Sequence, residues 1–254
     1  MQIVDFITED NAILFLLLFA RMSGLIAFFP FFSHLAIPIS VKTALAFYLS
    51  ILFFPVASLA NIDYSVGSLS ILILSELLLG FIAGLTLHIV FAALQLAGMQ
   101  IAMVMGFSMA SVMDPSSGIN APIISQILVL IAIMMLLAFD GHHMILLFLN
   151  KSIGHIELGS FYPQSYIWDY INESIKHMFM MGFILSFPVI AISLLADIIF
   201  GMLMKTMPQF NLLVVGFPIK IFLSFMVMIA TLGSIMLIFK KDFIEVFNFL
   251  NIFG

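Results

Sequence analysis

Five ionisable side chains stand inside or at the end of long apolar stretches of this sequence: Arg21, Glu76, Asp140, Asp197 and Lys220. An ionisable group in apolar surroundings is costly and therefore needs a partner or water. Two kinds of chemistry fit such groups, namely a relay for protons or ions and an ion pair that joins two helices. A relay needs several carboxylates along one path, whereas these lie on different segments. We therefore favour pairs such as Arg21 with Glu76, and expect a structural role for Arg21, Glu76, Asp140 and Lys220.

The stretch Asp140-Gly141-His142-His143 holds residue types that bind metals. Adjacent residues on a helix point about 100° apart, so we expect His142 and His143 not to face one ion. The sequence favours a turn in which Gly141 breaks the apolar run, and no metal site. The chain has no cysteine, which excludes disulfides and thiolate chemistry. Because no catalytic or phosphate-binding motif stands out, we expect neither an enzyme nor a bound cofactor.

Small residues recur at every fourth position in two places. Gly98, Ala102, Gly106 and Ala110 form one row, and Gly80 and Gly84 begin another. Such rows let a second backbone approach a helix closely in membrane proteins. We therefore expect Gly80, Gly84, Gly98 and Ala102 to lie where helices pack.

Methionines crowd the region of the row that begins at Gly98 and are followed by a polar loop, 114–122, rich in Gly, Pro, Ser and Asn. They are Met99, Met103, Met105, Met109 and Met113. Unbranched thioethers pack adaptably against irregular surfaces, and the loop composition is typical of a turn. Two interpretations carry equal weight at this point: an exposed connection, or a deformable methionine-lined element that blocks a conduit.

The elements that position these residues are predicted to be membrane helices. Hydrophobic residues make up 64% of the chain, charged residues 8%, and the mean hydropathy is +1.28. A soluble surface cannot be covered with so few charges. Net charge is −5, which excludes a basic surface for nucleic acid. Six runs approach the length that spans a bilayer, with a shorter one at 98–113: 11–32, 41–59, 69–97, 123–149, 178–196 and 212–239.

Proline and glycine interrupt several of these runs, as at Pro188 and Gly216-Phe217-Pro218. Kinked helices and true hairpin breaks both fit these interruptions. Residues 150–177 are the least apolar connection, and the tail after Lys240 is amphipathic. We expect that tail to lie on a membrane surface or to dock on a partner.

A series of short motifs follows one another along nearly the whole chain. They are Arg21 with Pro30, Pro38 with Lys42, Glu76 through Gly80, Gly106-Phe107-Ser108 through Asp114-Pro115, Asp140-Gly141-His142, Met207-Pro208-Gln209 and Gly216-Phe217-Pro218. Each motif alone is too short to identify a family, but their order and spacing along one chain together do so. In these motifs the chain resembles the FliR family of flagellar type III export-gate proteins, which has counterparts in virulence secretion systems.

The resemblance implies an all-α membrane protein whose long, kinked apolar helices form tilted hairpins in a cone largely raised out of the bilayer plane. It implies a single gate subunit, 1–254, in which 1–200 is approximately FliP-like and 201–254 is approximately a FliQ-like hairpin with the amphipathic tail. The expected partners are FliP-like and FliQ-like subunits, an FlhB-like protein, unfolded flagellar export substrates and membrane lipid, but no nucleic acid. The expected location is the flagellar basal body in the bacterial inner membrane.

The resemblance also places a pore plug in the loop that matches 106–122. It carries over the plug or seal residues Gly106, Phe107, Ser108, Met109, Met113, Asp114 and Pro115. This favours the conduit-blocking interpretation of the methionine-rich region. The alternative function is a secondary transporter or ion channel of the inner membrane, which the interrupted helices and embedded charges would also fit.

Overall fold

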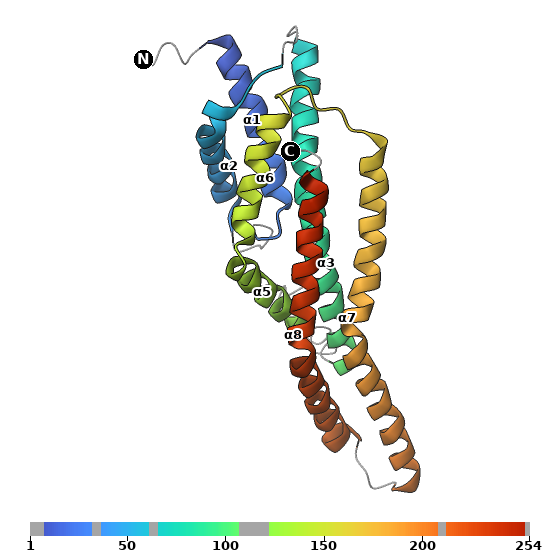
Figure 1. Cartoon of the computed structure of the whole chain (residues 1–254). Coiled ribbons are helices and arrows are strands. Elements are labelled where there is room, and N and C mark those ends of the chain that lie inside the picture. Colours follow the sequence, from blue (N-terminus) through green and yellow to red (C-terminus); the bar gives the residue numbers. More distant parts are fainter. Residues whose placement is uncertain (1–7, 32–36, 61–65, 107–121, 208–211, 252–254) are drawn as a thin grey trace. The chain divides into compact units, whose positions relative to one another are not determined.

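The computed structural model consists almost entirely of long helices (Figure 1). It describes residues 8–31, 37–60, 66–106, 122–207 and 212–251. In chain order the α-helices are α1 (Glu9–Phe28), α2 (Ile39–Phe53), α3 (Val66–Met105), α5 (Ile123–Ala138), α6 (Gly141–His155), α7 (Ser165–Thr206) and α8 (Phe217–Leu250). A 3₁₀ turn, η2 (Phe54–Val56), follows α2, and a π-helical turn, η4 (Leu212–Gly216), precedes α8.

The predicted class, an all-α membrane protein, is confirmed. In the described part of the chain five helices are long and apolar enough to cross a membrane: α1, α2 with η2, α3, α7 and α8. The pair of α5 and α6 adds a sixth if it counts as one broken span. The six predicted runs correspond to these elements.

Two predicted boundaries differ from the structure. Helix α3 is 40 residues long, so the run 69–97 and the first part of the shorter segment after it form one helix. It ends at Gly106, whose φ of +88° is a conformation that glycine adopts without a steric penalty and that commonly ends helices. Helix α7 begins at Ser165, so the polar connection that was expected to reach residue 177 is largely helical.

Proline acts differently at the two interruptions singled out in the sequence. Pro188 lies inside α7, which continues through it as one helix. Pro218 lies in the first turn of α8, where a missing backbone N–H costs nothing. The hairpin-break interpretation is therefore wrong at Pro188, where α7 is continuous, and holds between the end of α7 at Thr206 and the start of α8 at Phe217.

The amphipathic tail is not a separate surface element. It is the last part of α8, and one face of it, with Phe243, Phe247 and Phe249, is buried within the chain. Phe243 packs edge-on against Phe139 with ring centroids 5.5 Å apart, and Phe249 stacks on Tyr170 with centroids 3.3 Å apart. The expectation of a membrane-surface or partner-docking tail is wrong for this apolar face, because aromatic neighbours far away in sequence already cover it.

The chain forms two compact units that interleave along the sequence. The first comprises residues 1–89, 137–174 and 243–254, and the second comprises 90–136 and 175–242. Helices α3, α7 and α8 each contribute to both. In the first unit α1, α2 and α6 lie side by side (Figure 1). The predicted division at residue 200 concerns likeness to two other families and stays a prediction; residue 200 itself lies inside α7.

Candidate functional site

Arg21 and Glu76 form an ion pair in the interior of the first unit. Arg21 lies on α1 and Glu76 on α3, and Nε of Arg21 is 2.6 Å from Oε2 of Glu76. Their side chains are 1% and 0% exposed. The predicted pair between these two residues is therefore confirmed.

The remaining polar atoms of this pair bind the end of α6 and the loop after it. Nη1 of Arg21 donates to the carbonyl oxygen of Ser152 at 3.0 Å, and Nη2 donates to that of Ile156 at 3.3 Å. The backbone N–H of Gly159 donates to Oε1 of Glu76 at 2.8 Å. The carbonyl oxygen of Ser152 also accepts from the backbone N–H of Ile156 at 3.0 Å, so the guanidinium adds a second donor there and caps the carbonyls at the end of α6. The cluster therefore joins α1, α3 and α6 through charge-assisted hydrogen bonds.

Lys220 forms a second ion pair, in the second unit. Its Nζ lies 2.8 and 2.7 Å from the two carboxylate oxygens of Asp197. The Lys220 side chain is 9% exposed and that of Asp197 is 50% exposed. One turn before Asp197, the buried hydroxyls of Ser193 and Ser224 lie 2.8 Å apart. Both contacts join α7 to α8, so polar side chains bind the two arms of this hairpin to each other.

Small residues allow close helix crossings in both units. In the first unit an added Cβ at Gly80 would come within 2.9 Å of the backbone nitrogen of Leu25, and one at Gly84 within 2.8 Å of its carbonyl oxygen. In the second unit a Cβ at Gly98 would lie 2.9 Å from Cβ of Ser125. Ala102, one turn further along α3, is fully buried. The predicted packing at Gly80, Gly84, Gly98 and Ala102 is present.

Asp140 departs from the predicted set of embedded charges. Its side chain is 73% exposed, because it stands in the turn between α5 and α6 rather than inside a helix. The prediction that His142 and His143 diverge is also wrong here. Their ring centroids lie 4.2 Å apart, because two imidazoles at the first turn of α6 can rotate toward each other even though their Cα–Cβ bonds diverge.

The predicted plug residues fall almost wholly outside the described residues. Gly106 is described and ends α3, with its N–H donating to the carbonyl oxygen of Met103 at 3.2 Å. Phe107, Ser108, Met109, Met113, Asp114 and Pro115 lie outside the described ranges. Of the described methionines in this region, Met103 is exposed and Met105 is buried. The plug assignment therefore stays a prediction.

Several residues of these clusters were missed by sequence reasoning. Ser152 contributes its backbone carbonyl and its buried hydroxyl to the Arg21 cluster, and Gly159 contributes its backbone N–H; backbone atoms cannot be recognised from residue type, and the Ser152 hydroxyl was not noted. Asp197 was noted only as a charge at a segment end, yet Lys220 could have identified it as a partner if the two helices were placed as a hairpin. Gly24 faces Gly80 across the α1–α3 crossing and was not part of any recognised row.

The fold and these clusters define an all-α membrane protein whose buried charges pair between helices. Residues 12–246 match the family described as bacterial export proteins, family 1, and the chain belongs to this family. The curated relatives carry the name flagellar biosynthetic protein FliR. The protein from Bacillus subtilis (strain 168) is 31% identical over 233 residues, covering 90% of each chain.

Two further relatives come from other bacterial species. The FliR protein of Escherichia coli (strain K12) is 29% identical over 91% of this chain and 88% of its own length. That of Aquifex aeolicus (strain VF5) is 27% identical over 97% of both chains. The resemblance found in the sequence motifs is confirmed, and the chain is a membrane-embedded component of the flagellar export apparatus.

Proposed function

We propose that this chain is a non-enzymatic subunit of the export gate, which helps to form and seal the pore through which unfolded flagellar subunits pass. The observation that carries this proposal is the family match along nearly the whole chain. Its partners would be FliP-like and FliQ-like subunits and an FlhB-like protein, in the bacterial inner membrane at the flagellar basal body.

The apolar surface of the chain supports a role inside an assembly. On α2 the side chains of Ile39, Phe47 and Tyr48 are 82%, 49% and 62% exposed. Helices α7 and α8 carry further large exposed side chains, which include Phe183, Phe187, Met202, Phe222 and Ile229. Large apolar side chains exposed in such numbers mark contact with lipid or with other proteins. A subunit that packs against several neighbours around a pore requires such faces on more than one helix.

The end of α3 supports the placement of a plug after it. Gly106 stops the helix with a positive φ, and the chain enters the methionine- and glycine-containing stretch at that point. Among the described residues, the atom nearest to an added Cβ at this turn is on the ring of Phe217, at 3.5 Å. The requirement for glycine at residue 106 is therefore one of backbone conformation, which would fix the direction in which the plug segment leaves α3.

Deletion of residues 106–122 in an otherwise assembled gate tests the sealing role. We expect leakage of ions and small molecules across the inner membrane to rise, because the deletion removes the segment that is proposed to obstruct the pore. Leakage is measured by dye or ion uptake in cells, and assembly by co-purification of the FliP-like and FliQ-like subunits. Unchanged leakage in a fully assembled complex would contradict the proposal.

A single substitution gives a milder version of the same test. Gly106→Ala places an L-residue at a φ of +88°, which is strained by about 1–2 kcal/mol, and we expect a partial leak. The control is Gly201→Ala on α7, where an added Cβ meets nothing within 4 Å. Equal leakage from the two variants would show that the turn at Gly106 has no part in sealing the pore.

The transporter alternative predicts activity of the chain by itself. Ion pairs occupy Arg21, Glu76, Asp197 and Lys220, and paired charges favour a structural role over a relay. Substrate-dependent uptake by the purified chain alone in lipid vesicles would revive the alternative. Recovery of the chain from gentle detergent with its gate partners supports the export-gate proposal, and recovery as a detergent-free monomer opposes it.

A further inference from the structure

The turn between α5 and α6 has an unusual conformation for an aspartate that precedes a helix. Asp140 occupies the N-cap position of α6 with φ 59° and ψ 28°, and its side chain makes no capping hydrogen bond. Among the described residues it is the one non-glycine residue with a positive φ. An N-cap aspartate usually has an extended backbone and accepts a hydrogen bond from the first turn. Here the conformation gives up that bond and is the less favourable one for an L-residue.

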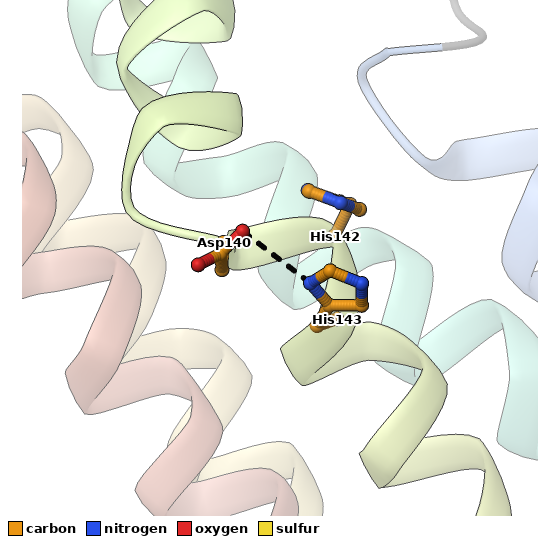
Figure 2. Close-up of side chains that lie close together, drawn as sticks. All are labelled: Asp140, His142 and His143. Atoms are coloured by element: carbon orange, nitrogen blue, oxygen red, sulfur yellow. Dashed lines mark ion pairs between the residues drawn. The ribbon is translucent and has the colours of Figure 1, made fainter.

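The carboxylate points instead toward the histidines that follow it (Figure 2). Oδ1 of Asp140 lies 3.4 Å from Nδ1 of His143. The imidazole of His142 lies beside that of His143, with ring centroids 4.2 Å apart and planes tilted by 37°. One potential ligand atom from each of the three residues lies within 4.8 Å of the others.

We propose that Asp140, His142 and His143 bind a divalent transition-metal ion of the zinc class. Two imidazole nitrogens and one carboxylate oxygen are a ligand set that suits Zn²⁺, Co²⁺, Ni²⁺ or Cu²⁺ better than Mg²⁺ or Ca²⁺. Ligand atoms around a tetrahedral zinc lie about 3.4 Å apart, given metal–ligand distances of about 2.1 Å. The three potential ligand atoms lie within 4.8 Å of one another. Rotation of the exposed side chains can bring them to the spacing that a zinc ion requires.

Access and orientation are consistent with such a site. The side chains of Asp140 and His143 are 73% and 63% exposed, so an ion can reach them from outside the chain. His142 is partly buried, and its Nδ1 is buried without a hydrogen-bond partner in the described structure. This leaves Nε2 of His142 as the nitrogen available to the ion. Three protein ligands leave a coordination position for water or for a side chain of a neighbouring subunit.

The site is tested by metal titration of the full-length chain within its detergent-solubilised assembly. The preparation carries a histidine-free affinity tag and is stripped with a chelator. Co²⁺ is the probe, followed by its visible absorption, and Zn²⁺ is added in competition. We expect saturable Co²⁺ binding that Zn²⁺ displaces with a Kd of about 10 µM or tighter, while Mg²⁺ does not compete. Absence of saturable binding would overturn the proposal.

Substitutions assign the binding to this turn. His143→Gln and Asp140→Asn remove one ligand each, and asparagine tolerates a positive φ. We expect each to weaken Zn²⁺ binding at least about tenfold, since even loss of a residue that merely supports a ligand costs that much. His155→Gln is the matched control, because His155 is an exposed histidine at the other end of α6. Equal affinity of the His143→Gln and His155→Gln proteins would refute the site.

A spectroscopic measurement on the unaltered protein covers the case in which a variant fails to assemble. Pulsed electron paramagnetic resonance of bound Cu²⁺ detects the remote nitrogen of each coordinated imidazole. We expect two imidazoles on one ion. A signal from one imidazole or none would exclude the arrangement in which both histidines bind the ion.

Discussion

At the scale of single residues, buried charges are stabilised by complete sets of partners. The Arg21 guanidinium bonds one carboxylate and two helix-terminal carbonyls, and the Glu76 carboxylate bonds that guanidinium and one backbone N–H. Removing charges from water costs several kcal/mol per ion, which only good geometry and additional hydrogen bonds offset. The cluster therefore stabilises the fold only while every member is present.

Loss of one partner should be far more harmful than loss of both. Arg21→Met leaves Glu76 buried without a counter-ion, and we expect a loss of about 3–5 kcal/mol of unfolding free energy. Lys151→Met is the control, because Lys151 is exposed and makes one 3.4 Å bond to Asn251; its effect should stay within about 0.5 kcal/mol. Unfolding by SDS in mixed micelles, followed by circular dichroism, measures both. Equal stability of the two variants would show that the ion pair contributes nothing.

The double variant Arg21→Met with Glu76→Leu completes this comparison. It removes both charges, so we expect it to recover part of the stability lost in Arg21→Met. Recovery is partial, because the carbonyl groups of Ser152 and Ile156 and the N–H of Gly159 still lose the bonds that Arg21 and Glu76 made to them. A double variant less stable than the single one would contradict the pairing argument.

Whether a contact between single residues could be predicted from the sequence depended on whether a charged side chain or a backbone atom makes it. Arg21 and Glu76 could be paired because charges are rare in this chain and a buried charge needs an opposite one. The bonds to the carbonyl groups of Ser152 and Ile156 and to the N–H of Gly159 could not be predicted, since they involve backbone atoms that any residue supplies. The geometry of Asp140 was missed because residue type does not determine whether an aspartate caps a helix or turns away from it.

At the scale of elements, the positions of small residues determine how closely helices approach. An added Cβ at Gly80 collides with the backbone of α1, whereas one at Gly154 on α6 meets nothing within 4 Å. The row of small residues in the sequence predicted the first contact correctly. It could not identify the opposing residue, Gly24, because periodicity on one helix contains no information about its neighbour.

Alanine at these two glycines should change stability in opposite directions. Gly80→Ala forces α1 and α3 apart, and overpacking of this kind costs about 1–3 kcal/mol. Gly154→Ala adds a methyl group to open space and removes the entropic disadvantage of glycine in a helix, which should stabilise the chain by about 0.5–1 kcal/mol. The same SDS unfolding assay decides between them. A shift of the same sign in both variants would mean that the close crossing at Gly80 does not limit packing.

The end of α8 should behave as part of the core and not as a membrane anchor. Phe243 is 0% exposed and contacts the rings of Phe139 and Phe247. Phe243→Ala should therefore lower the unfolding free energy by about 3–5 kcal/mol. Ile244→Ala, at an adjacent exposed position, is the control and should change it little. If Phe243→Ala alters membrane attachment but leaves stability unchanged, the tail acts as a separate surface element.

At the scale of the whole molecule, most residues in the apolar windows of several helices are not buried within the chain. Only 17% of the α2 span and 22% of the most apolar window of α8 are buried within the chain. Composition predicted this apolar surface but not what covers it, since lipid and protein neighbours select for the same residue types. The family match favours protein neighbours for part of it, and chemical labelling can separate the two.

Single cysteines report what covers each face, because the chain has none of its own. Tyr48→Cys on α2 and Ile229→Cys on α8 replace side chains that are 62% and 67% exposed. We expect both to react poorly with maleimide in the assembled gate and faster after the partners are dissociated in micelles, since packing against a neighbouring subunit excludes the reagent. Glu157→Cys, at an exposed position in the loop after α6, should react equally in both states. If the reactivity at residues 48 and 229 does not change on dissociation, these two faces are covered by lipid or detergent. The neighbouring gate subunits would then contact other helices of the chain.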